Sequence, residues 1–199
     1  MASVLETLVG QFAGTPVQRL SQSLGTDDAT AQKALGAALP LLVSALAKNA
    51  SEPKGADALH RALAKDHDGS VLNDVGGFLN QPDTKTGDGI LRHVLGDRRQ
   101  AAEAGISQAS GLDARGAATL LATLAPVVMG ALGRQQRQQG LDTAALAQML
   151  QGERQQAANA PGLSGLAGLL DADKDGQIVD DLAKLGGKML GGLFGKRSG

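Results

Sequence analysis

Apolar residues recur along this chain at helical spacing, and glycine or proline interrupts them at intervals. The first such segment, residues 3–12, places Val4, Leu5, Leu8 and Phe12 on one side. A spacing of three and four residues is the signature of a helix with one apolar face. The pattern therefore predicts a short amphipathic helix at the start of the chain.

Two later segments, residues 39–46 and 125–132, are apolar nearly all round. A helix without a polar face belongs in the centre of a fold, where neighbouring helices surround it. Each segment carries a proline, Pro40 or Pro126, which removes one helical hydrogen bond. We therefore expect two buried central helices, each with a kink or a break just before its proline.

The chain around these two segments repeats itself. Residues 20–27 (LSQSLGTD) match residues 106–113 (ISQASGLD) at an offset of 86 (106 minus 20), and the match continues without a gap through both apolar segments. In each copy a glycine suits the left-handed conformation that ends a helix. The aspartate two residues later, Asp27 or Asp113, suits the N-cap of the next helix. We interpret this match as an internal duplication.

The predicted fold class is all-α: two internally duplicated multi-helical modules with EF-hand-like acidic loops, packed as one unit. Further helices are expected at residues 56–65, 71–79, 87–96, 142–150, 163–170 and 178–194, and polar loops at 81–87 and 152–162. The polar segment 133–139 is expected to form the exposed end of the second central helix, stopped by Gly140. The predicted organisation is a first module at 1–86, a second at 87–182 and a glycine-rich amphipathic tail at 183–199.

An acidic stretch near the C-terminus carries the strongest chemical signal. Its aspartates alternate and are followed by a glycine, as in an EF-hand loop, where several oxygens surround a hard Ca²⁺ ion and the glycine allows a sharp bend. The loop is incomplete, because Leu182 stands where a bidentate glutamate belongs. The candidate ligands are Asp171, Asp173, Asp175, Gln177, Asp180 and Asp181.

A second acidic stretch, residues 66–74, superposes on residues 173–181 at an offset of 107 (173 minus 66). Its candidate ligands are Asp66, Asp68 and Asp74, and it has Ala64 where the other copy has Asp171. The alternative interpretation of both loops is a turn followed by a helix N-terminus, since aspartate and glycine favour turns and carboxylates suit a first helical turn. Both interpretations stay open from the sequence.

Composition excludes several classes of protein. The 19 basic and 20 acidic residues give a net charge of −1, which argues against a nucleic-acid binder. There is no cysteine for a disulfide or a thiolate metal site. The first residues show no signal-peptide pattern, and no run of about 18 apolar residues predicts a membrane span. We expect a cytoplasmic protein whose tail packs on protein rather than on a membrane surface.

The sequence shows no catalytic constellation. Its three imidazoles, His60, His67 and His93, have no second histidine or cysteine at metal-ligand spacing. No nucleophile with an orienting base is recognisable, and no phosphate-binding loop is present. We therefore expect a protein that is not an enzyme.

The Leu-Gly-x-Asp turn, the proline-bearing core helices and the segment Gly-Asp-Gly-Ile-Leu-Arg-His-Val-Leu-Gly at 87–96 together resemble the YidB-like family of bacterial domains of unknown function. The resemblance spans roughly residues 20–182. It implies an all-helical fold and a cytoplasmic bacterial protein, and it implies no activity for any residue.

Together these observations predict a non-enzymatic helical module for interaction or assembly, with a protein partner or a second copy of itself, and with a structural calcium site. The alternative function is a calcium-responsive sensor or buffer that uses both acidic loops. A structural site orders its loop, whereas a sensor repacks its helices when the ion binds.

Overall fold

The structure is a computed structural model that describes residues 3–158. Within this range every regular element is a helix, so the predicted all-α class is confirmed. The α-helices are α1 (Val4–Gln11), α2 (Thr15–Leu24), α3 (Asp28–Asn49), α4 (Pro53–Asp66), α5 (Val75–Asn80), α6 (Thr84–Val94), α7 (Arg99–Ser110), α8 (Ala114–Gln139) and α9 (Thr143–Ala158). Two 3₁₀ turns, η1 (Ser70–Asn73) and η2 (Gly96–Arg98), complete the order.

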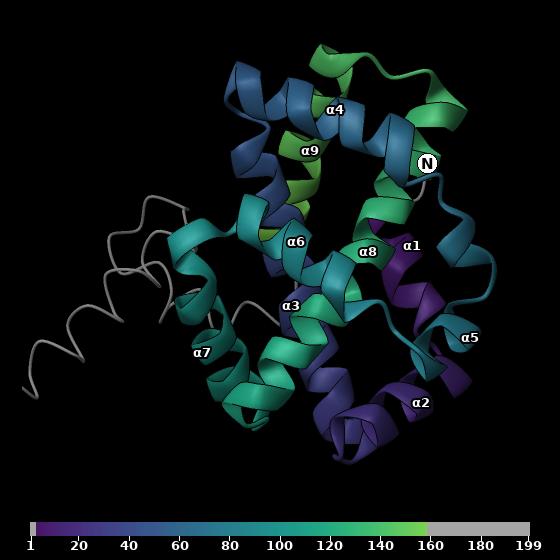
Figure 1. The fold of residues 1–199 in the computed structure, drawn as a ribbon, viewed down its shortest axis with the longest axis vertical. Coiled ribbons are helices and arrows are strands. Elements are labelled where there is room, and N and C mark those ends of the chain that lie inside the picture. Colours follow the sequence, from purple (N-terminus) through teal and green to yellow (C-terminus); the bar gives the residue numbers. More distant parts are fainter. Residues whose placement is uncertain (1–2, 159–199) are drawn as a thin grey trace, which may run out of the picture.

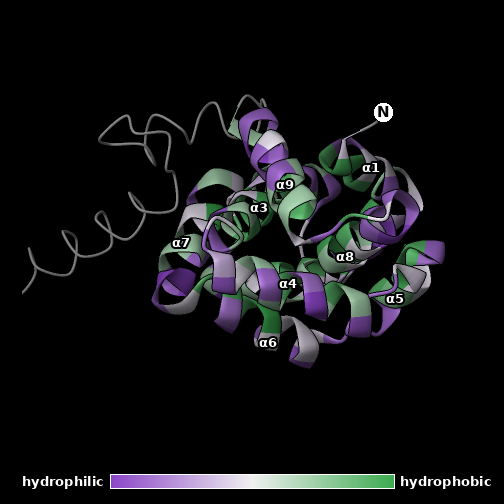
Figure 2. Ribbon diagram, turned by 90° about the horizontal axis from the view of Figure 1, so that it is seen from above, coloured by the Kyte–Doolittle hydropathy of each residue, from purple (hydrophilic) through white to green (hydrophobic). Residues whose placement is uncertain are grey.

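The long helices α3 and α8 lie against each other in the middle of the molecule, and the shorter helices surround them (Figure 1). Most residues of both helices are buried, and the described residues share one hydrophobic core. Hydrophobic residues predominate along α3 and α8, while hydrophilic residues line the outer side of α4 (Figure 2). The prediction of two buried central helices is therefore confirmed.

Neither proline ends its helix. Pro40 lies inside the 22 residues of α3, and Pro126 lies inside the 26 residues of α8. Of the two alternatives that the sequence left, a kink or a break before the proline, the break is wrong, because burial on all sides holds each helix together although one hydrogen bond is missing. By length and composition both helices also reach what a membrane span needs, with mean hydropathies of 1.3 and 1.7. In the fold 72% and 89% of those windows are buried, so both helices serve as core helices here.

The two matched sequences form the same local structure. Gly25 ends α2 and Gly111 ends α7, each in the left-handed conformation, with φ of 66° and 86°. Asp27 then accepts a hydrogen bond from the amide of Thr30 at 2.9 Å, and Asp113 accepts one from Gly116 at 2.6 Å. The hairpins α2–α3 and α7–α8 therefore share their caps as well as their sequence, as an internal duplication predicts.

Several helix boundaries differ from the sequence prediction. The expected helix at 71–79 is divided into η1 and α5, because the Asp74 carboxylate accepts from the amide of Gly77 and starts a new helix there. The expected polar turn at 81–87 is largely helical, because Asp83 caps α6 through the amide of Thr86. The expected loop from 152 is helical as well, since α9 continues to Ala158 along α3.

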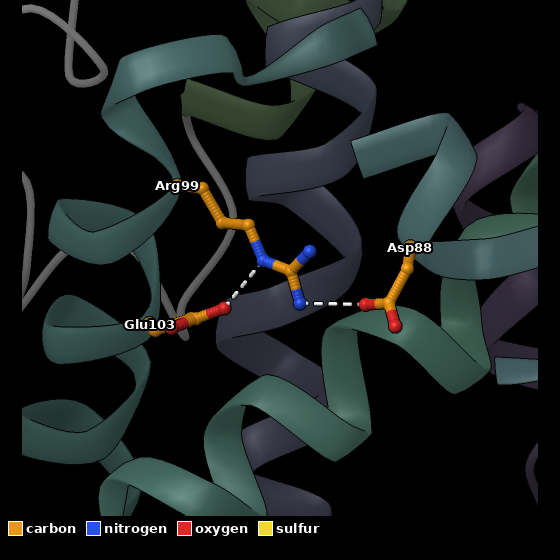
Figure 3. A network of polar contacts seen from close by, with 3 residues as sticks. All are labelled: Asp88, Arg99 and Glu103. Carbon is orange, nitrogen blue, oxygen red and sulfur yellow. Dashed lines mark hydrogen bonds and ion pairs between the residues drawn. The ribbon is translucent and has the colours of Figure 1, made fainter. Parts of the chain in front are cut away.

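Helix α6 packs closely on α8. A Cβ atom at Gly87 would lie 1.8 Å from the carbonyl oxygen of Ala122, so only glycine permits this approach. The same helix is tied to α7 by Arg99, whose guanidinium lies 2.6 Å from the Asp88 carboxylate and 2.7 Å from the Glu103 carboxylate (Figure 3). Its contacts with α8 and α7 hold α6 in a fixed position in the fold.

Helix α1 is held at its N-terminus by a residue from the far end of the described chain. The buried Glu153 of α9 accepts hydrogen bonds from the amides of Val4 at 2.9 Å and Leu5 at 3.1 Å. These amides belong to the first turn of α1, where no helical acceptor exists. A carboxylate also suits the positive end of the helix dipole.

Candidate binding groove and the first acidic loop

The first acidic loop, residues 66–74, is a capped turn. Asp66 is the exposed last residue of α4, and Asp74 is the N-cap of α5. The Asp68 carboxylate accepts from the amide of Ser70 at 2.8 Å. Hydrogen bonds from the hydroxyl and the amide of Ser70 hold the pKa of Asp68 below its usual value. Asp68 and Asp74 thus bind backbone amides, which favours the turn interpretation for this loop.

Two arginines of α8 provide positive charge to the inner side of the loop. Arg134 donates to the carbonyl of Gly69 and to the Asn73 side chain, both at 2.6 Å. Arg137 donates to the carbonyls of Leu63, Ala64 and His67 at 3.0 to 3.3 Å. In an EF-hand loop the ion organises the chain through carboxylate and carbonyl oxygens. Here guanidinium groups bind two of the loop's carbonyl oxygens, those of His67 and Gly69, and two more at the end of α4.

The loop approaches the C-terminal part of α8 very closely. A Cβ atom at Gly133 would lie 1.8 Å from the carbonyl oxygen of His67. Gly133 and Gln136 are buried, and the Gln136 amide group donates to the carbonyl of His60 at 3.4 Å. The prediction that residues 133–139 form an exposed helix end is therefore wrong for its first half, although Gly140 does end the helix.

The candidate calcium ligands are not assembled in the described part of the chain. No three of His, Cys, Asp or Glu come together there in a group that could hold a metal ion. Asp66, Asp68 and Asp74 lie at separate points of one turn. The other candidates, Asp171, Asp173, Asp175, Gln177, Asp180 and Asp181, lie outside the described residues, as does the tail 183–199.

A groove with a volume of about 820 Å³ lies between α4 and α6. Small residues of α4, Ala58 and Ala62, line one wall, and Gly89 and Ile90 of α6 line the other. Its apolar floor is formed by the buried side chains of Leu46, Leu59, Val94 and Met129. Concave, mostly apolar sites of several hundred cubic ångströms are the usual binding sites of proteins.

The groove has charged groups at both ends of its α4 wall. Lys54, in the first turn of α4, lines one end, and Asp66 with His67 lines the other. Burial lowers the pKa of His67 below its ordinary value, which favours the neutral imidazole. The structure places His67 half-buried at the groove.

The other two histidines are hydrogen-bonded to backbone carbonyls. A ring nitrogen of His93, Nδ1, lies 2.9 Å from the carbonyl oxygen of Gly89 on its own helix. The Nε2 atom of His60 lies 3.1 Å from the carbonyl oxygen of Leu141. Each contact orients the ring toward the backbone rather than toward a side chain that could activate it.

Sequence reasoning did not identify this groove. The one available signal was the spacing of Gly55, Ala58 and Ala62, which places three small residues on one face of α4. Small residues on a helix face indicate close packing as readily as an open wall. The distinction depends on where α6 lies, and that position is fixed by Gly87 and Arg99.

The end of α4 has a counterpart in α9. Residues 57–66 match residues 144–153 at an offset of 87 (153 minus 66), with buried leucines in step at Leu59/Leu146 and Leu63/Leu150. Asp66 then corresponds to Glu153. Glu153 binds the first amides of α1, whereas Asp66 has its carboxylate at the open end of the groove.

Fold and groove together define an all-helical, internally repeated protein with an apolar surface groove between two helices. The chain belongs to DUF937, a family of bacterial proteins of unknown function, whose model matches residues 6–135 and 136–199. This agrees with the resemblance seen in the sequence, and the match in two segments accords with a duplicated arrangement. No curated protein and no solved structure matches the chain.

Replacing Arg134 with alanine is expected to lower the free energy of unfolding by about 1–2 kcal/mol, because the carbonyl of Gly69 and the Asn73 side chain lose a charged donor. Chemical denaturation followed by far-UV circular dichroism measures the change. Arg115→Ala, at an exposed position of the same helix, is the matched control and should change stability by less than about 0.5 kcal/mol. Equal effects of the two substitutions would contradict a role for Arg134 in holding the loop.

Proposed function

We propose that this protein is a non-enzymatic interaction module whose α4–α6 groove binds an amphipathic helix of a protein partner. The bound helix runs antiparallel to α4, with its apolar face in the groove and its N-terminus at Asp66. This form of recognition, a helix in an apolar groove, recurs among protein complexes.

The observation that carries the proposal is the equivalence of Asp66 and Glu153. Inside the molecule, Glu153 already binds the N-terminus of α1 through two amides, at 2.9 and 3.1 Å. Asp66 stands at the matching position of α4, exposed, at the end of a groove that no described helix fills. The free amides of an incoming helix are the groups that such a carboxylate binds best.

The length of the groove and the charges at its two ends also fit a bound helix. The wall from Gly55 to Asp66 spans 11 helical steps, or about 16 Å at a rise of 1.5 Å per residue. A helix of about three turns therefore covers the groove. Lys54 at the opposite end suits the negative end of the helix dipole, which fixes the direction of the bound helix.

A photo-crosslinking amino acid at Ala58, on the exposed wall of the groove, tests the proposal in the producing bacterium. We expect a discrete product at position 58 and none at Lys65, an exposed position of the same helix outside the groove. Mass spectrometry should place the attachment on the apolar face of a helix in the partner. Asp66→Asn should reduce the product, whereas Asp57→Asn, on the exposed side of α4, should not.

Two results would overturn this function. One is a product at position 58 that attaches to an extended segment or a loop rather than to a helix. The other is a product whose yield is the same in the Asp66→Asn and Asp57→Asn variants. The proposal also takes the cytoplasm as the compartment, and fractionation of the same cells provides the check.

A structural calcium site in the second acidic loop is a separate proposal, and one comparison supports it. At the offset of 86, the residues that correspond to Arg134 and Arg137 are Lys48, in α3, and Ser51, which follows the end of α3. The sequence thus has no arginine pair at the corresponding positions, and the second acidic stretch has one aspartate more, Asp171. Cation binding by oxygens is the alternative way to hold such a loop.

Saturating calcium is expected to raise the thermal midpoint of the full chain. At free calcium near one hundred times the dissociation constant, binding adds about 2.7 kcal/mol, and each kcal/mol moves the midpoint of a chain of this size by ~2–4 °C. Circular dichroism in calcium, in magnesium and in chelator measures the shift. Asp173→Asn should abolish it, whereas Asp68→Asn in the first loop should leave it unchanged, and the reverse outcome would place the ion in the first loop.

A further inference from the structure

The contact between α6 and α8 uses a carbonyl group that a proline has left without its helical donor. The carbonyl of Ala122 would normally accept from the amide four residues later, but that residue is Pro126, which has none. Gly87 presents its Cα atom to this oxygen, so closely that a Cβ atom would lie 1.8 Å from it. Such an approach allows a Cα–H···O contact with the carbonyl.

The other central helix has the same feature. At the offset of 86, Gly36 corresponds to Ala122 and Pro40 to Pro126, so the carbonyl of Gly36 also lacks its helical donor. Gly36 lines a groove of about 320 Å³ between α3 and the α1–α2 corner, together with Leu35 and Leu39. Helix α1, which corresponds in sequence to the end of α6 at the same offset, lies along one side of this groove through Val9, and no described helix lies in the groove itself.

An exposed apolar residue lines this groove, so a segment that binds there would bury apolar surface. Val9 lines it and is 57% exposed, the one large hydrophobic side chain among the described residues that is exposed. The neighbouring Phe12 and Val17 are buried but contribute to the same wall. Covering such a patch removes apolar area from water and is favourable.

A second copy of the α6 sequence lies in the C-terminal part of the chain. Residues 87–96 (GDGILRHVLG) match residues 186–195 (GGKMLGGLFG) at an offset of 99 (186 minus 87). Both glycines at the ends and the central leucine are identical, and the other apolar positions remain apolar. The buried residues of α6 and its C-cap are Gly87, Leu91, Val94 and Leu95, and they correspond to Gly186, Leu190, Leu193 and Phe194.

We propose that residues 186–195 dock on α3 of the same chain in the way that α6 docks on α8. Gly186 lies against the carbonyl of Gly36, and Leu190 and Leu193 enter the groove lined by Val9. The site is independent of the α4–α6 groove, and its occupant is an internal segment of defined sequence rather than an external partner.

The sequence of α1 explains why this place is left for the C-terminal segment. Residues 4–10 (VLETLVG) also match residues 90–96 (ILRHVLG) at the offset of 86, so α1 carries the apolar part of the same motif. At the position of Gly87, however, the sequence has Met1. A methionine cannot make the close approach to a carbonyl that glycine makes at Ala122.

The length of the chain allows the contact. Between Ala158, the end of α9, and Gly186 there are 28 residue steps (186 minus 158), which reach up to about 90 Å when extended. A domain of this size is much smaller than that reach. The segment can therefore lie on its own α3 without strain in the connection.

Site-specific crosslinking in the full chain tests the proposal, and the chain contains no cysteine to interfere. The pair Val9→Cys and Leu190→Cys, treated with a short bis-maleimide, should give an intramolecular link identified by mass spectrometry. The pair Lys65→Cys and Leu190→Cys is the control and should give none. Circular dichroism of each variant confirms that it is folded.

Substitution of the glycine distinguishes the proposed contact from a loose association. Adding Gly186→Leu to the chain that carries Val9→Cys and Leu190→Cys should reduce the yield of the intramolecular crosslink to that of the control pair. Adding Gly187→Leu, at the position that corresponds to the half-exposed Asp88, should leave the link in place. No link, a link insensitive to Gly186→Leu, or a link found only between two chains would each overturn the proposal. None of these results bears on the helix bound at Asp66.

Discussion

Replacing Gly87 with alanine is expected to lower the free energy of unfolding by about 2 kcal/mol. The new Cβ atom would lie 1.8 Å from the carbonyl oxygen of Ala122, and this atom belongs to the backbone of a buried helix that cannot move aside. Overpacking of this kind costs about 3 kcal/mol. Alanine recovers about 1 kcal/mol of that through its higher helix propensity.

Gly89→Ala is the matched control, because Gly89 lies two residues further along the same helix and a Cβ atom there meets nothing within 4 Å. This substitution should raise the free energy of unfolding by up to about 1 kcal/mol. The two variants should therefore differ in thermal midpoint by ~6–12 °C, at ~2–4 °C for each kcal/mol. Similar midpoints for the two variants would show that the contact of Gly87 with Ala122 does not restrict this position.

Replacing Glu153 with alanine is expected to lower the free energy of unfolding by about 3 kcal/mol. The buried carboxylate accepts from the amides of Val4 and Leu5, and its removal leaves both amides of a buried helix start without a partner. A hydrogen bond to a charged group contributes about 1.5–3 kcal/mol, and buried donors without partners cost about as much. Chemical denaturation followed by circular dichroism measures the loss.

The neutral substitution Glu153→Gln separates the two contributions of the carboxylate. Glutamine keeps one acceptor oxygen, so Glu153→Gln should lower the free energy of unfolding by about half as much as Glu153→Ala. In both variants, amide hydrogen exchange should show that protection against exchange is lost first at Val4 and Leu5. The reason is that α1 opens locally before the rest of the fold when its first amides lose their acceptor. Uniform loss of protection across α1 and α8 would instead indicate that Glu153 supports the whole core.

The features that sequence predicted correctly depend on neighbours along the chain. The caps at Asp27 and Asp113 and the left-handed glycines at Gly25 and Gly111 are set by interactions within a few residues. The burial of α3 and α8 follows from composition, since a helix that is apolar all round has only one stable location. The duplication could be seen because its two copies keep these residues in step.

The features that sequence did not predict depend on contacts between distant segments. Arg134 and Arg137 looked like part of an exposed polar helix end, and only the fold brings them against the carbonyls of residues 63–69. The α4–α6 groove exists because Gly87 fixes α6 on α8 while α4 crosses elsewhere. Neither arrangement follows from a local pattern, since each requires the relative position of two helices.

The bond between Glu153 and α1 also sets an order of events during synthesis. The amides of Val4 and Leu5 are made before their acceptor, which follows 149 residues after Val4. At roughly 5–20 residues per second, the wait is on the order of ten seconds. During that time the amides of Val4 and Leu5 lack this acceptor, although α3 and α8, on which α1 also packs, are made earlier. The completion of α9 is thus the step at which the first turn of α1 gains its acceptor.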